Sequence, residues 1–127
     1  MDVDVIFGDD EPNAFWINGT SCVSINTKQG KRTQLFCLLH EAGHAIIRSN
    51  KKYDSFFPYG NDSKNKAIAR RMDVLREEVI AWEEGRELAL ALGIELEHKA
   101  WHNCVKRNLF DYVKWAYDPD KFHKDTI

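Results

Sequence analysis

The first third of the chain carries short apolar runs that are typical of β-strands. Val3 to Phe7 is a β-branched run that ends at a glycine and two aspartates. The runs Ala14 to Ile17 and Cys22 to Ile25 flank Asn18-Gly19-Thr20. Asn-Gly is a strong hairpin signal because both residues tolerate a positive φ angle. The pattern predicts one strand, then a β-hairpin, then a polar loop over residues 26–32.

The apolar period changes at Thr33. The segment TQLFCLLHEAGHAIIRS, from Thr33 to Ser49, is apolar around much of its circumference. Such a helix must be buried on most sides, and Thr33 is its expected N-cap. Two histidines and a glutamate stand within this apolar segment, and such a conflict between pattern and residue type tends to mark a functional site.

Two more helices are expected downstream. After a loop over residues 50–65, the second helix runs from about Ser63 to Leu92 and ends at Gly93 as its C-cap. Its apolar positions recur at helical intervals, at Ile68, Met72, Leu75, Val79 and Trp82. The third runs from about Glu97 to Tyr117, with one apolar face formed by Trp101, Val105, Leu109 and Tyr112. Residues 118–127 are expected to fray.

These elements predict an α+β fold, with a small N-terminal β-sheet followed by three helices and with the HEAGH-bearing helix buried. A length of 127 residues with 43% hydrophobic residues fits a single domain over residues 1–127. The acidic N-terminus does not resemble a signal peptide, and no apolar run reaches the ~18 residues that span a bilayer. Three cysteines without a CxxC pair fit the reducing cytoplasm and small buried side chains.

The segment His40-Glu41-Ala42-Gly43-His44 carries the chemistry. Residues at i and i+4 of a helix share one face, so His40 and His44 can both turn a ring nitrogen toward one Zn²⁺. Glu41 can then reach a water on the metal and serve as the general base. Gly43 leaves room for another element to approach the metal side closely. We therefore predict a catalytic zinc site.

A catalytic zinc takes a third protein ligand. In the longer pattern HExxHxxGxxH the last histidine is that ligand, but here Ile47 and Asn50 replace its Gly and last His. The third ligand must therefore come from the second helix. Glu78 shares a helical stripe with Val74, Ala81 and Gly85, which allows close helix contact. Glu78 is the predicted ligand and Glu77 the alternative. The other acids follow patterns typical of a solvent-exposed helix face. Glu77 shares a stripe with Asp73 and Glu84. Glu83 shares a stripe with Arg76 and Glu87.

The remaining polar candidates carry weaker signals. An oxyanion donor could be Tyr53, Tyr59, His102 or Tyr112, and Tyr59 is the one to test because its loop lies between the ligand-bearing helices. His98 and His102 also stand four apart, yet they flank an exposed lysine without an acidic or cysteine partner. They are therefore interpreted as surface or helix-capping residues.

The segment HEAGH followed by Glu78-Val79-Ile80-Ala81 resembles a gluzincin-type zinc metallopeptidase, and more closely the ImmA/IrrE family, over about residues 18–90. The resemblance implies that His40, His44 and Glu78 hold zinc and that Glu41 is the general base. It also implies a cytoplasmic peptidase that cuts a regulatory protein. Such a peptidase can be encoded by a phage or another mobile element. In that family a polar residue commonly follows the pattern ExxA, which is Glu78 to Ala81 here. In this chain Trp82 stands at that position instead. By analogy with zincin folds, Val23, Ser24 and Ile25 would form the edge strand that binds the substrate.

The leading hypothesis is an intracellular zinc endopeptidase acting on a protein or peptide. The alternative is a non-catalytic interaction protein that keeps zinc for structure, for example a phage-encoded inhibitor of a host protein. A DNA-associated protease is a third possibility, prompted by basic clusters at residues 28–32, 48–52 and 64–71, although a net charge of -2 argues against nucleic acid. No membrane partner is expected.

Overall fold

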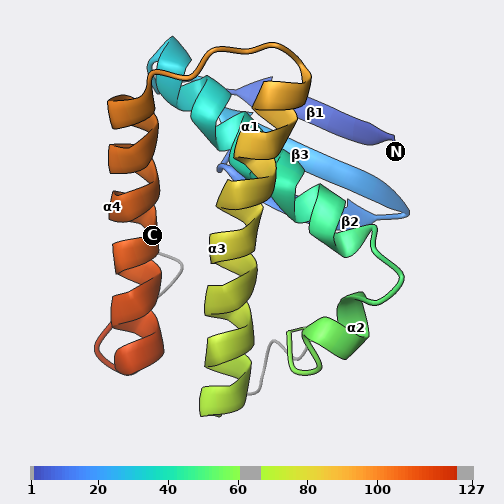
Figure 1. The fold of residues 1–127 in the computed structure, drawn as a ribbon, viewed down its shortest axis with the longest axis vertical. Coiled ribbons are helices and arrows are strands. Elements are labelled where there is room, and N and C mark those ends of the chain that lie inside the picture. Colours follow the sequence, from blue (N-terminus) through green and yellow to red (C-terminus); the bar gives the residue numbers. More distant parts are fainter. Residues whose placement is uncertain (1, 61–66, 123–127) are drawn as a thin grey trace. The chain divides into compact units, whose positions relative to one another are not determined.

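The computed structural model describes residues 2–60 and 67–122 of the chain (Figure 1). They divide into two compact units, one formed by residues up to 50 together with 80–95, the other by residues 51–79 and those from 96 onward. The expected α+β class is confirmed, because a small mixed sheet is followed by helices. Among the described residues, no helix has the length and apolar character needed to cross a bilayer.

The first unit contains a three-stranded sheet. Its strands are β1 (Val3–Gly8), β2 (Ala14–Asn18) and β3 (Thr20–Asn26), in the order β1-β3-β2. β2 and β3 are antiparallel and joined at Gly19, whose φ of +73° is the conformation that the Asn-Gly signal requires. β1 pairs with β3 in parallel. The predicted strand and hairpin are therefore confirmed.

The predicted edge position of Val23, Ser24 and Ile25 is wrong, because β3 is the central strand and all three residues are fully buried. The hairpin signal predicted only that β2 pairs with one side of β3. β1 pairs with the other side of β3, and residues 9–13 cross the end of the sheet to connect β1 with β2. Hydrogen bonds fix this crossing: Ser24 Oγ donates to the Pro12 carbonyl at 2.5 Å, and the backbone amide of residue 26 donates to Asn13 Oδ1 at 2.9 Å.

Helix α1 (Lys31–Arg48) lies against β3 and β2 in the same unit (Figure 1). No residue from 34 to 48 is exposed, which confirms the predicted buried helix. Its N-cap is Gly30, not Thr33, because the helix begins three residues earlier than expected. The Gln34 amide donates to the Gly30 carbonyl at 2.9 Å, and the Gln34 side chain donates to the Gln29 carbonyl at 2.7 Å. This side chain contact stabilises the turn that leads into α1.

Helix α3 (Ile68–Ala91) runs through both units, and its end matches the prediction. Gly93 has a φ of +71°, and the next amide, of Ile94, donates to the Ala89 carbonyl at 2.9 Å, which closes the helix as expected of a C-cap glycine. The expected start near Ser63 lies outside the described residues. Part of the expected loop over residues 50–65 instead forms the short helix α2 (Tyr53–Phe56).

The second unit corrects the predicted faces of α3. Ile68 and Met72, expected in the core, are exposed, whereas Asp73 and Glu77, expected on a solvent face, are buried. Donors from α2 and the segment after it account for the difference. Tyr53 Oη donates to Glu77 Oε1 at 2.5 Å, and the backbone amide of residue 59 donates to Asp73 Oδ2 at 2.9 Å. A carboxylate with such donors can be buried at acceptable cost.

Helix α4 (His98–Tyr117) agrees closely with its prediction. Glu97 is the N-cap, and its side chain accepts hydrogen bonds from the first-turn amides of residues 99 and 100. Trp101 is buried as expected. Cys104 and Trp115 are the other buried residues of this helix. Residues 118–122, expected to fray, form a hydrogen-bonded turn in which the amide of residue 122 donates to the Asp118 carbonyl at 3.0 Å. Residues 123–127 lie outside the described part.

Candidate metal centre

The HEAGH segment lies in the middle of α1, as the motif requires. His40 and His44 project from successive turns, with ring centroids 4.8 Å apart. His40 and Glu41 are buried, and His44 is half-buried. The two rings therefore differ in exposure, with His40 in the core and His44 partly open to solvent.

Glycines bring α1 and α3 into backbone contact beside the motif. A Cβ atom built on Gly43 would stand 2.0 Å from the Ala81 carbonyl oxygen, and one on Gly85 would stand 2.6 Å from the Leu39 carbonyl oxygen. Real Cβ atoms do not approach so closely, so only glycine permits this packing. The predicted roles of Gly43 and of the small-residue stripe on α3 are thus confirmed.

The third predicted ligand joins the histidines. Glu78 stands on α3 one turn before Trp82, and its carboxylate, with the ring nitrogens of His40 and His44, forms a group whose ligand atoms lie within 4.8 Å of one another. It is the only such group of three or more metal-ligating side chains among the described residues. Glu77, the alternative ligand, instead binds Tyr53.

The donor set fits a zinc ion in kind and nearly in spacing. Two imidazoles and one carboxylate are the ligands of many catalytic zinc sites. Ligand atoms around a tetrahedral zinc stand roughly 3.3–3.5 Å apart, given metal–ligand bonds of about 2.0–2.2 Å. The ligand atoms of this group lie within 4.8 Å of one another, so the widest spacing exceeds that around a bound zinc. Three protein ligands also leave one position open to water.

Glu41 stands next to the ligand pair, as predicted. Its Oε1 lies 3.3 Å from His40 Nδ1, and both side chains are nearly inaccessible to solvent. A carboxylate at the second ring nitrogen fixes the orientation of an imidazole. Glu41 is therefore in contact with one ring of the metal-binding group.

Two aromatic rings that sequence reasoning did not assign to the site pack against the histidines. Trp82 lies parallel to His40, with ring centroids 4.1 Å apart and an interplanar angle of 5°. Phe15 of β2 lies parallel to His44 at 6.4 Å. The sequence did signal Trp82, which stands four residues after Glu78 at the place where the family pattern expects a polar residue. The ring of His40 is thus oriented by stacking on an indole.

The other candidates, Tyr59, His98 and His102, are exposed. The side chain of Tyr59 is 47% exposed, and its backbone amide anchors its loop to Asp73, which gives no support to an oxyanion role. His98 and His102 are exposed and stack on each other at 6.4 Å, as expected of surface residues.

All three cysteines are free. Cys104 is buried, and its burial raises the pKa of the thiol although the nearby Arg107 opposes the shift. Cys22 and Cys37 are half-buried, so the expectation of a small buried side chain holds fully only for Cys104.

Comparison with known protein families, with curated proteins and with solved structures found no match to this chain. The likeness to the ImmA/IrrE family rests on the motif residues alone.

Proposed function

We propose that the protein is a zinc-dependent endopeptidase that acts in the cytoplasm on a protein or peptide. The observation that carries the proposal is the grouping of His40, His44 and Glu78, with Glu41 beside it. A site that keeps zinc for structure alone is usually closed by four ligands and needs no general base. Three ligands with an adjacent buried carboxylate favour catalysis.

Each residue has a distinct task in this proposal. The two imidazoles and the Glu78 carboxylate would hold the ion, and zinc so bound acidifies water and polarises a carbonyl group. Glu41 takes a proton from the attacking water on one carboxylate oxygen and gives it to the nitrogen of the leaving amine. Trp82 stacks on the His40 ring and so holds the orientation of that ring.

The substrate is proposed to bind along β2. This strand lies at an edge of the described sheet, and its Phe15 packs on His44, so that the strand edge passes next to the metal-binding group. An extended peptide can add to such an edge through backbone hydrogen bonds. β2 thereby takes the role that the sequence assigned to Val23, Ser24 and Ile25.

The test compares wild type with Glu41→Gln on a complex library of peptides, with cleavage products identified by mass spectrometry. Gln keeps the size of the side chain but cannot accept the proton, so the variant should bind zinc as wild type does and lose about 10²- to 10⁴-fold of the turnover. Glu83→Gln, an exposed carboxylate on α3, is the matched control and should cleave normally. Equal cleavage by Glu41→Gln and wild type would refute the general-base role. A zinc-loaded wild type that cuts no peptide would favour the non-catalytic interaction protein.

A further inference from the structure

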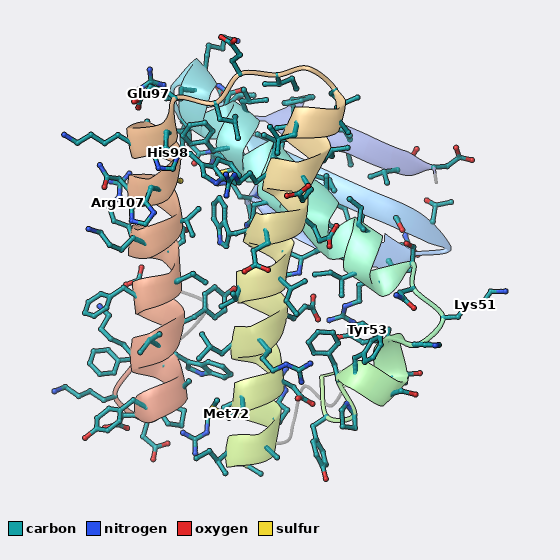
Figure 2. All side chains as sticks on the ribbon, viewed as in Figure 1. Lys51, Tyr53, Met72, Glu97, His98 and Arg107 are labelled. Carbon is teal, nitrogen blue, oxygen red and sulfur yellow. The ribbon has the colours of Figure 1, made fainter. Side chains whose placement is uncertain are left out.

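The solvent-facing side of α4 carries more cations than acids. At 100° per residue, the positions that face away from buried Trp101 and Trp115 bear Lys99, Lys106, Arg107 and Lys114 (Figure 2, where Arg107 is labelled). The helix contains one acidic residue, Asp111, whose carboxylate lies 3.2 Å from Lys114 Nζ. Lys99, Lys106 and Arg107 therefore carry the excess charge of this face. This is a local excess of positive charge in a chain of net charge -2.

Three apolar side chains share this face with the cations. Phe110, Val113 and Tyr117 are 60%, 47% and 86% exposed, and they follow the spacing i, i+3, i+7. Together they expose on the order of 300 Å² of mostly apolar surface, which is the size of patch that often marks a binding site. Lys114 Nζ lies 5.0 Å from the centre of the Phe110 ring, so a cation already borders the apolar stripe. The cations and these three residues are named the α4 outer face.

We propose that the α4 outer face binds an acidic amphipathic helix of a partner protein. The i, i+3, i+7 anchors are the pattern with which one helix packs against another. The cations that flank the anchors complement Asp or Glu on the partner, which selects the partner and speeds association. Nucleic acid is a poorer match, because the whole chain is net negative.

The face lies on α4 and shares no residue with the metal-binding group, so binding there is independent of peptidase activity. Its consequence for recruitment rests on the proposed function: a substrate bound at α4 stays near the peptidase site longer than it would by binding at its cleavage site alone. Binding can therefore be measured without zinc and without turnover, and failure of one proposal leaves the other standing.

The experiment measures binding of a labelled, synthetic 20-residue helical peptide by fluorescence anisotropy. The peptide carries Leu at i, i+3, i+4 and i+7 and Glu at the flanking positions. A second peptide replaces every Glu by Lys. A third carries the same residues as the first in an order without helical periodicity. We expect the acidic amphipathic peptide to bind about tenfold or more tightly than either control.

Two surface variants assign that binding to α4. Lys106→Glu combined with Arg107→Glu reverses two charges, and Tyr117→Ser removes the most exposed anchor; each should weaken binding about tenfold. Lys51→Glu, an exposed cation on another segment, is the control and should bind as wild type does. All of these side chains are exposed, so the variants should fold.

The outcomes separate the possible partners. Equal affinity for the three peptides, or binding that none of the α4 changes weakens, would overturn the proposal. Tighter binding to duplex DNA or to vesicles of anionic phospholipid than to the acidic peptide, with the same dependence on the α4 variants, would also overturn it by assigning the face to another class of partner.

Discussion

Substituting Gly43 by alanine should separate two helices that form the metal centre. The added Cβ would stand 2.0 Å from the carbonyl oxygen of Ala81, 2.8 Å from its carbonyl carbon and 3.0 Å from its Cα. All three atoms belong to the backbone, so no side-chain rotation relieves the overlap. An ordinary contact of about 3.4 Å requires the two helices to move apart locally by about 1.4 Å.

Two opposing effects determine the change in the free energy of unfolding. Alanine is a better helix former than glycine by about 1 kcal/mol, which would stabilise α1. Overpacking costs typically 1–3 kcal/mol, and more where rigid backbone must move. Because the overlapping atoms all belong to the backbone of Ala81, the packing term should win, with a net loss of about 1–2 kcal/mol or more. Displacing Ala81 by about 1 Å also moves Glu78, one turn away, so zinc affinity should fall at least about tenfold.

The assay combines urea unfolding of the metal-free protein with zinc affinity from competition against a chelating dye. Gly30→Ser is the matched control: a Cβ at residue 30 meets nothing within 4 Å, its φ is -62°, and serine is a good N-cap. The control should be at least as stable as wild type and bind zinc equally. If Gly43→Ala matched wild type in both stability and zinc affinity, the inferred backbone contact between α1 and α3 would be refuted.

Three further predictions concern single side chains. Trp82→Leu should lower zinc affinity about tenfold because the His40 ring loses its stacking partner, and Trp82→Phe should restore much of it in the same dye competition. Tyr53→Phe removes a buried hydrogen bond to Glu77 and should destabilise the protein by about 1–3 kcal/mol in urea unfolding, whereas zinc affinity should change little. The raised pKa of Cys104 means that the unfolded thiol ionises first as pH rises. Stability should therefore fall above the ordinary thiol pKa of 9.0, and replacing Cys104 by alanine should remove that part of the pH dependence in parallel unfolding titrations.

The parts of the fold that the sequence predicted are those fixed by local chemistry. Asn18-Gly19 determines a turn by its own backbone preferences, and Gly93 ends a helix for the same reason. The HEAGH motif fixes its own geometry, because residues four apart on a helix must share a face. Glu78 also groups with the two histidines as expected, since the small residues Ala81 and Gly85 mark the side of α3 that contacts α1, whereas its binding of zinc stays a prediction.

The parts that failed depend on partners far away in the sequence. Whether Val23 to Ile25 form an edge depends on where β1 pairs, and no residue within the hairpin carries that information. Asp73 and Glu77 have the pattern of a solvent face, and only the donors from residues 53 and 59 make their burial possible. Trp82 stood out in the sequence as a departure from a family pattern, but its contact with His40 required the helix packing to be known.

The central claim is that His40, His44 and Glu78 hold one zinc ion, and elemental analysis of the purified protein by mass spectrometry tests it most directly. Wild type, His44→Ala, Glu78→Ala and Glu77→Gln would each be reconstituted with zinc, desalted and measured. We predict about one zinc per chain in wild type and in Glu77→Gln, and little or none in the other two variants. A wild type that retains no zinc, or a Glu78→Ala variant that retains as much as wild type, would contradict the assigned metal centre.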